Sequence, residues 1–250
     1  MNHRDFAVLV AAQLVAGLGA LAALLFVSAP YGKHSRPGWG PKMDSKAAWI
    51  VMESPAVVTI AAMFIASGDR STGAFFALGL WELHYLYRSF VYGSLQRGAK
   101  PTFPLVLAAG AIVFNVNNGL INGYDLFSRG KADLIRLADP ATALGLAVFL
   151  GGFALHLASD ATIRALRKDG ETGYKIPYGG LFRLVSNPNY LGEILQWSGF
   201  ALMTRSAAAW AFAFFTFCNI FPRALANHRW YREHFPDYPA ERKAILPFLL

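Results

Sequence analysis

The chain alternates long apolar stretches with short polar ones. A run of about 20 apolar residues is long enough for a helix to cross a membrane. Seven such stretches occur, at residues 6–29, 47–66, 72–92, 103–126, 141–157, 187–203 and 207–222. The segments between them are too short for a separate soluble domain. We therefore expect an all-α polytopic membrane protein, a single bundle of seven transmembrane helices that forms one domain over residues 1–250.

Composition supports a membrane protein. Of the residues, 55% are hydrophobic and only 15% are charged, which is too apolar for an ordinary soluble domain. The first stretch exceeds the apolar core of a cleavable signal peptide, so we expect it to be a retained span. The single cysteine, Cys218, excludes a disulfide within the chain and a cysteine-based metal site.

The Lys and Arg residues predict an orientation. Cytosolic loops of membrane proteins carry an excess of these residues. Most of the 23 lie in the first, third and fifth connecting segments and the tail, whereas the opposite side holds Arg4, Arg70, Arg129, Lys131, Arg136 and Arg205. This bias predicts an outside N-terminus and a cytosolic C-terminus. Because topology explains the net charge of +8, we expect no nucleic-acid partner.

The segment that leads into the sixth stretch changes character. A Gly-, Tyr- and Pro-rich link at 170–180 precedes Asn189, Glu193 and Gln196, which share one face of a helix at i, i+4 and i+7. Two amides and a carboxylate facing lipid would be costly. The pattern therefore predicts that this face lines a cavity or meets a polar partner.

Two earlier stretches contain polar groups suited to binding a carbonyl. Glu53 lies in the second and Tyr85 in the third, and tyrosine and a protonated carboxyl group are both hydrogen-bond donors. A structural hydrogen bond of Glu53 before the kink at Pro55 is an alternative. A buried ion pair between Glu82 and Arg88 is another.

Amides and cations gather toward the predicted cytosolic boundary. Asp160, Arg164 and Arg167 share a face, as do Arg223, Asn227 and Tyr231 near the last stretch. Together with Asn189 they suit a ligand with phosphates and hydrogen-bonding rings, and we expect a phosphorylated dinucleotide. Alternatives are a lipid-binding stripe for the Arg223 face and interhelical hydrogen bonds for Asn115, Asn118 and Asn122.

The usual motifs of soluble nucleotide-binding and metal sites are absent from the sequence. No Gly-x-Gly-x-x-Gly and no Gly-x-x-x-x-Gly-Lys-Ser/Thr occurs, and no His-x-x-x-His or Cys/His cluster predicts a metal. A Ser–His–Asp site has no supporting motif either.

The same residues lie within segments that resemble the steroid 5α-reductase family over nearly the whole chain. The segments that carry the resemblance are Tyr31-Gly32-Lys33-His34, Glu53-Ser54-Pro55, His84-Tyr85-Leu86-Tyr87-Arg88, Asn118-Gly119, Ser159-Asp160, Leu166-Arg167-Lys168, Tyr174-Lys175-Ile176-Pro177, Asn189-Tyr190-Leu191-Gly192-Glu193 and the closing Asp237-Tyr238-Pro239.

The resemblance implies a seven-span, NADPH-dependent reductase of 3-oxo-4-ene steroids. It implies that Glu53 and Tyr85 hold the 3-ketone as the catalytic pair, and we add Trp49 and Arg88 as candidate substrate contacts. For the cofactor it implies Asp160, Arg167, Tyr174, Asn189, Glu193, Arg223 and Tyr231, to which we add Arg97, Asn118, Lys175 and Asn227. Relatives often have arginine at Lys175 and histidine at Asn227.

Other functions remain open at this point. The C-terminal third also resembles membrane methyltransferases of the isoprenylcysteine type, although Glu53 and Tyr85 would then have no role. Polyprenol or enoyl-thioester substrates would use the same enone polarisation. A lipid-binding or scaffolding protein would need purely structural polar clusters. We expect a monomer in contact with membrane lipid, in a bacterial inner membrane or the endoplasmic reticulum.

Overall fold

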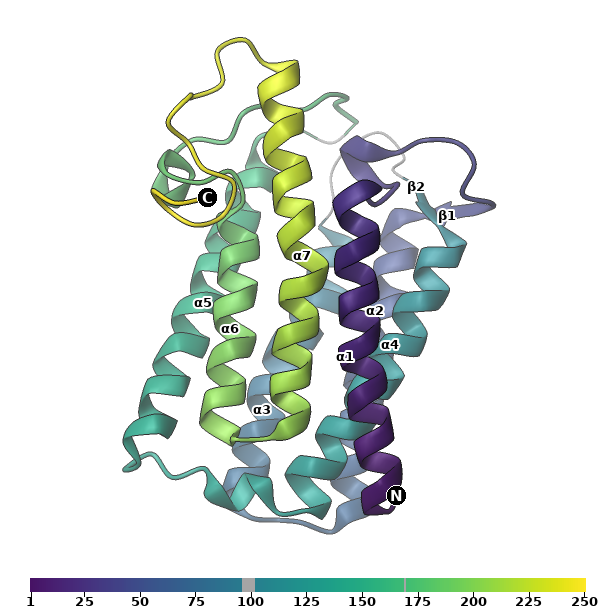
Figure 1. The fold of residues 1–250 in the computed structure, drawn as a ribbon, viewed down its shortest axis with the longest axis vertical. Coiled ribbons are helices and arrows are strands. Elements are labelled where there is room, and N and C mark those ends of the chain that lie inside the picture. The colour runs from purple at the N-terminus through teal and green to yellow at the C-terminus, as the bar shows by residue number, and fades with distance from the viewer. Residues whose placement is uncertain (96–101, 169) are drawn as a thin grey trace.

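A computed structural model describes residues 1–95, 102–168 and 170–250 of the protein. Long helices lie side by side along one axis, with the N-terminus at the lower end and the C-terminal segment at the upper end (Figure 1). The α-helices of the described residues are α1 (His3–Phe26), α2 (Ser45–Ser67), α3 (Thr72–Leu86), α4 (Leu105–Gly123), α5 (Pro140–Ala165), α6 (Pro188–Thr204) and α7 (Ala207–His234).

Polar caps define where several helices begin. Asp44, Ser71, Asp139 and Ser206 each accept a hydrogen bond from a backbone N–H in the first turn of the helix that follows. Such caps satisfy donors that have no partner within the helix. At the other end of α2, Gly68 takes a left-handed conformation with φ 72° and ends the helix.

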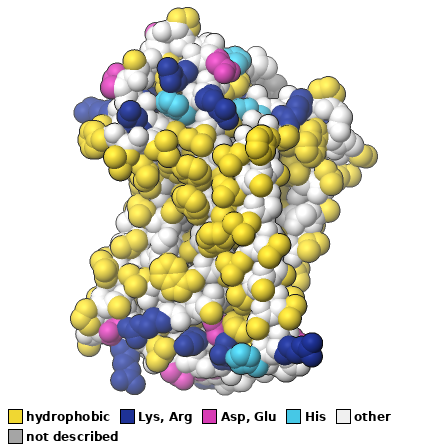
Figure 2. Space-filling view, in the orientation of Figure 1, with side chains coloured by type: hydrophobic (Ala, Val, Ile, Leu, Met, Phe, Trp, Pro, Cys, Tyr) yellow, Lys and Arg dark blue, Asp and Glu magenta, His cyan; other side chains and the backbone are white. Residues whose placement is uncertain are grey.

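The membrane-protein class is supported, but the number of spans is not established. Among the described residues, five helices are long and apolar enough to cross a membrane, namely α1, α2, α4 with its extension, α5 and α7. α3 and α6, with 15 and 17 residues, are shorter. Hydrophobic side chains cover the middle of the molecule, and Lys, Arg, Asp and Glu gather at its two ends (Figure 2). Seven spans and the orientation of the termini stay predictions.

The structure corrects several details of the predicted elements. α5 and α7 continue past the predicted ends at 157 and 222, to Ala165 and His234. π-helical turns extend α3 through Tyr87–Tyr92 and α4 through Tyr124–Ser128. The fold is also not purely helical, because β1 (Lys42–Asp44) pairs antiparallel with β2 (Thr102–Pro104). This small sheet lies at the upper end of the bundle (Figure 1).

An aromatic core joins α3, α6 and α7. The Trp197 ring lies 5.3 Å from that of Trp81 and 4.4 Å from that of Phe212, measured between ring centroids. Such pairs contribute about 0.5–1.5 kcal/mol each beyond their buried area. The Trp81 indole also donates to the Ala56 carbonyl of α2, at 3.2 Å. The Tyr85 ring packs on this core, 5.1 Å from Trp81, and is therefore held in place.

Candidate active site

Two adjoining cavities occupy the upper half of the bundle. The outer cavity, of about 270 Å³, lies between the segment after α1, the upper ends of α5 and α7, and the link before α6. The inner cavity, of about 440 Å³, lies deeper, between α2, α3, α4, α6 and α7. The two share a wall, which consists of Ala29, Tyr31, Trp49, Tyr92, Asn189, Tyr190 and Arg223.

The outer cavity is rich in cations and aromatic rings. Its lining includes Lys33, Arg164, Arg167 and Arg223. The Lys33 ammonium lies over three rings, at 4.0 Å from the centroid of Tyr231, 5.1 Å from Trp230 and 5.9 Å from Tyr174. The Arg167 guanidinium lies 4.9 Å from the Tyr174 centroid. Flat rings and several cations suit a ligand that carries phosphates and planar bases.

Lys33 has an unusual electrostatic environment. Burial, and then the nearby Arg167 guanidinium, lower the pKa of the Lys33 ammonium to about 7. Two cations held close together in a partly desolvated cavity repel each other. A bound phosphate would relieve this repulsion, so the cavity is arranged for an anion.

The C-terminal segment holds in place two residues that line the outer cavity, Asn187 and Pro177. The Asn187 side-chain amide donates to the carbonyls of Ala224 and Ala244, at 3.1 and 3.0 Å. The buried Arg242 donates to the Pro177 carbonyl in the link before α6, at 3.2 Å. These bonds fix the Gly-rich link and the tail against α7.

The inner cavity places Glu53 and Tyr85 on one surface. The Asn115 amide of α4 donates to Glu53 Oε2 at 3.1 Å and to the Met52 carbonyl at 2.7 Å. Asn115 therefore orients the carboxyl group. Apolar side chains of α4 and α7 form much of the remaining wall, among them Leu107, Phe114, Phe215 and Ile220. This combination suits a largely apolar ligand with one carbonyl group.

Arg88 lies on the π-helical turn that extends α3. Its guanidinium lies between the rings of Trp49 and Tyr92, at 4.3 and 4.4 Å, and its Nη1 is 3.9 Å from Asp160 Oδ2. The Glu82 carboxylate has no hydrogen-bond partner among the described residues. The alternative of a Glu82–Arg88 ion pair is therefore wrong. π-helical turns often occur at functional sites, and here the turn brings Arg88 and Tyr92 into the cavity wall.

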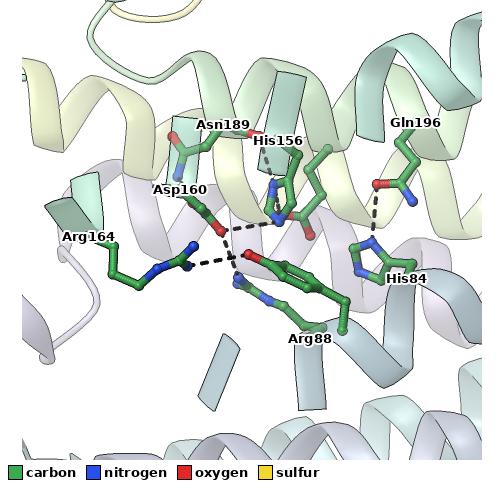
Figure 3. A network of polar contacts seen from close by, with 9 residues as sticks. His84, Arg88, His156, Asp160, Arg164, Asn189 and Gln196 are labelled. Carbon is green, nitrogen blue, oxygen red and sulfur yellow. Dashed lines mark hydrogen bonds and ion pairs between the residues drawn. The ribbon is translucent and has the colours of Figure 1, made fainter. Parts of the chain in front are cut away.

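A polar network joins α5 and α6 where the two cavities meet (Figure 3). Asn189 Nδ2 donates to Asp160 Oδ1 at 3.1 Å. His156 Nε2 lies 3.4 Å from Asp160 Oδ2, and His156 Nδ1 lies 3.2 Å from the Asn189 carbonyl and 4.0 Å from Glu193 Oε2. Arg164 Nη1 reaches the Tyr87 hydroxyl at 3.5 Å.

Most predicted site residues converge on these cavities. The outer cavity is lined by Asp160, Arg167, Tyr174, Asn189, Arg223, Asn227 and Tyr231, and the inner one by Glu53, Tyr85, Arg88 and Glu193, while Trp49 lines both. Glu193 thus lies on the inner side, although it was predicted as a cofactor contact.

Two predicted cofactor residues lie outside both cavities, and a third cannot be placed. Asn118 lines neither cavity, and its side-chain oxygen accepts from Gln13 of α1 and from Asn122 one turn further along α4. Lys175 is exposed and binds Glu171 at 2.5 Å, outside both cavity walls. Arg97 lies outside the described residues. Asn118 and Lys175 are therefore not carried into the cofactor site.

Sequence reasoning missed two residues of these walls. Lys33 lies in a short loop, where a single lysine near several other cations gives little signal. His156 lies in the fifth apolar stretch, four residues before Asp160, so an i, i+4 pairing was readable in the sequence. Its contact with Glu193 depends on how α5 packs against α6, which no local pattern predicts.

Comparisons with known proteins agree on one family. A family model described as 3-oxo-5-alpha-steroid 4-dehydrogenase matches residues 101–250. The chain is 41% identical to 3-oxo-5-alpha-steroid 4-dehydrogenase 2 of Sus scrofa, over 97% of this chain and 96% of that protein. For the enzyme of the same name in Homo sapiens the identity is 39%, with 97% and 96% covered. For steroid 5-alpha-reductase DET2 of Arabidopsis thaliana it is 37%, with 94% and 93% covered.

Proposed function

The chain belongs to the 3-oxo-5-alpha-steroid 4-dehydrogenase family, and on that premise we propose that it reduces the 4,5 double bond of 3-oxo-4-ene steroids with NADPH. The protein is an oxidoreductase. One observation carries the proposal for this chain. Glu53 and Tyr85, which can both donate a hydrogen bond to a carbonyl, line a cavity with many apolar side chains that shares a wall with a cation-rich cavity.

The residues of the outer cavity fit NADPH. Lys33, Arg167 and Arg223 would hold its phosphates, and Asn189 and Asn227 would hydrogen-bond its polar groups. The 2′-phosphate adds negative charge, so a cavity with several cations favours NADPH over NADH. When bound there, NADPH supplies the hydride. Planar side chains such as Tyr174 and Tyr231 would pack against its rings.

The inner cavity would polarise the ketone. Protonated Glu53 and the Tyr85 hydroxyl both donate to the 3-oxygen, while Asn115 holds Glu53 in position. As carbon 5 is reduced, negative charge gathers on that oxygen and an enolate forms. Donors aimed at developing charge contribute about 3–4 kcal/mol each to the transition state. The apolar wall excludes water and strengthens both hydrogen bonds.

The membrane arrangement completes the proposal. Seven spans, an outside N-terminus and a cytosolic C-terminus would open the outer cavity to the cytosol, where NADPH is present. The steroid would enter from the lipid bilayer, because its apolar body partitions there. We keep a single domain over residues 1–250, a monomer surrounded by lipid, and a location in a bacterial inner membrane or the endoplasmic reticulum as parts of the proposal.

Purified protein in detergent or nanodiscs tests this function. With testosterone or progesterone we expect consumption of NADPH, followed by its absorbance, and a 5α-dihydro product identified by mass spectrometry. NADPH should bind and S-adenosylmethionine should not. Binding of S-adenosylmethionine without NADPH would instead indicate the methyltransferase. If NADPH were oxidised only with polyprenol or enoyl-thioester substrates, the protein would still be a reductase, but steroids would be excluded as its substrates.

The Lys33 environment predicts a pH-dependent affinity for NADPH. The pKa of Lys33 is about 7 in the protein without NADPH. A phosphate that pairs with the ammonium must therefore raise this pKa when NADPH binds. Above about pH 7 binding therefore takes up a proton, and affinity falls by up to about tenfold per pH unit. Isothermal titration calorimetry between about pH 7 and about pH 9 measures this slope.

Two substitutions test whether Lys33 causes the pH dependence of NADPH affinity. Lys33→Arg should flatten the slope, because a guanidinium stays charged over this range. Lys175→Arg is the matched control, since Lys175 is exposed and outside both cavities, and it should retain the wild-type slope. An unchanged slope in Lys33→Arg would mean that Lys33 does not pair with the phosphates.

A further inference from the structure

His156 lies between two carboxylates on the wall that separates the cavities. Its side chain is only 1% exposed. Nε2 is 3.4 Å from Asp160 Oδ2 on its own helix, and Nδ1 is 4.0 Å from Glu193 Oε2 on α6. Figure 3 shows His156 joined by dashed lines to Asp160 and to Asn189. Asp160 lines the outer cavity, whereas His156 and Glu193 line the inner one.

The two ring nitrogens of His156 face different groups. Nδ1 lies 3.2 Å from the Asn189 carbonyl, which can only accept, so Nδ1 carries a proton. Nε2 faces the Asp160 carboxylate at 3.4 Å and has no hydrogen-bond partner among the described residues. The titratable and charged groups that face the ring from α3 and its π-helical turn, from α5 and from α6 are His84, Tyr87, Arg88, Asp160 and Glu193.

We propose that His156 is the proton relay of the reaction, and that it protonates Glu193, which in turn donates a proton to carbon 4 of the steroid. The inference rests on the proposed function, whose enolate needs one proton at carbon 4. Polar side chains that could carry a proton from the outer to the inner cavity follow one another here as Asp160, His156 and Glu193.

The atoms and electrons balance without a further reactant. The electron pair of the enolate forms the carbon 4–hydrogen bond as the Glu193 oxygen–hydrogen bond breaks. The Glu193 carboxylate then takes the Nδ1 proton of His156. Their 4.0 Å separation exceeds a hydrogen bond, so the carboxylate must turn toward the ring. As Nδ1 gives up its proton, Nε2 takes one from Asp160, which lines the outer cavity and regains its proton from water there.

His156→Asn separates the relay from a structural role. An asparagine amide can still donate to the Asn189 carbonyl but cannot carry a proton. We expect turnover to fall about 10²-fold, at the lower end of the range for a positioned acid, with KM and NADPH affinity changed less than about twofold. Proton delivery should become rate-limiting, so the solvent deuterium isotope effect on kcat should rise. The isotope effect from deuterated NADPH should fall.

His84→Asn is the matched histidine control. His84 lines the same cavity, but its Nδ1 meets the Gln196 amide oxygen at 3.1 Å rather than a carboxylate. This variant should alter KM or stability and leave both isotope effects as in the wild type. The same shift in isotope effects for both variants would show a general disturbance of the cavity and would overturn the relay.

Hydrogen–deuterium exchange at carbon 4 of the steroid, measured without NADPH, tests the relay without turnover. In heavy water, the bound saturated 3-ketone should take up deuterium at carbon 4, because Glu193 can remove that proton while Glu53 and Tyr85 stabilise the enolate. Mass spectrometry should show slower exchange in His156→Asn. Equal exchange rates in the wild type and His156→Asn would reject the relay.

The outcomes also distinguish the relay from the function on which it rests. If wild-type protein neither oxidises NADPH with a steroid nor binds one, the proposed function fails. If it reduces the steroid, and His156→Asn does so with unchanged kcat and isotope effects, only the relay fails.

Discussion

Glu53→Gln and Tyr85→Phe should each lower steroid turnover by about 10²- to 10³-fold, because each removes one donor aimed at the charge that develops on the 3-oxygen. NADPH affinity should stay within about twofold of the wild type, since neither residue lines the outer cavity. Single-turnover measurement of hydride transfer, together with titration of NADPH, separates these two effects.

The structure provides close controls for both substitutions. Glu82→Gln changes a carboxyl group on α3 that lines neither cavity, and Tyr178→Phe removes a hydroxyl from a side chain that is 57% exposed. Both should turn over like the wild type. Phenylalanine at position 85 keeps the ring that packs on Trp81 and Trp197, so the fold should be retained. Wild-type turnover in either active-site variant would remove that residue from the catalytic pair.

The apolar stretches predicted the helices better than their ends. Each predicted stretch overlaps one α-helix of the described residues. The predicted ends of α5 and α7 came too early, because both helices continue into polar sequence beyond the apolar stretch. Backbone hydrogen bonds do not depend on side-chain polarity, so α7 continues to His234, just before Phe235 and Pro236. The short pairing of β1 with β2 joins segments 60 residues apart and leaves no local signal.

The candidate site was predicted where several cues coincide and missed where packing decides. Glu53 and Tyr85 stood out because polar groups in apolar stretches are rare. Asn118 was predicted from the same cue, which also fits an amide that joins helices, and in the structure it bonds Gln13 of α1 and lines neither cavity. The role proposed for His156 could not be predicted from sequence, because it depends on the proximity of Glu193 on α6. That proximity depends on the contact between α5 and α6.

Glycines make this contact between α5 and α6 unusually close. A Cβ added to Gly152 would lie 2.5 Å from the Gln196 nitrogen and 2.6 Å from the Gly192 carbonyl oxygen. A Cβ on Gly192 would lie 2.7 Å from the His156 nitrogen. The pattern repeats seven residues before Gly152 and seven after Gly192, where Gly145 of α5 opposes Gly199 of α6. Small residues at a helix interface let two backbones approach each other, as in other membrane bundles.

Gly152→Val should therefore lower both stability and activity. The added side chain meets backbone atoms, which cannot move aside as a flexible side chain can, so the helices must separate. Overpacking of this kind costs about 1–3 kcal/mol and sometimes more. At about 2–4 °C per kcal/mol for a chain of this size, we expect the thermal midpoint in detergent to fall by about 2–12 °C.

Activity should fall further than stability alone explains, because the same separation pulls His156 away from Asn189 and Glu193. Gly151→Val is the neighbouring control: no atom lies within 4 Å of a Cβ there, so the same side chain on the same helix should change the midpoint by less than about 2 °C. Purified variants assayed below their midpoints, with folded fractions measured, distinguish misplacement from unfolding. Equal midpoints and turnover for the two variants would mean that the close approach of α5 and α6 does not hold the network of Figure 3 in place.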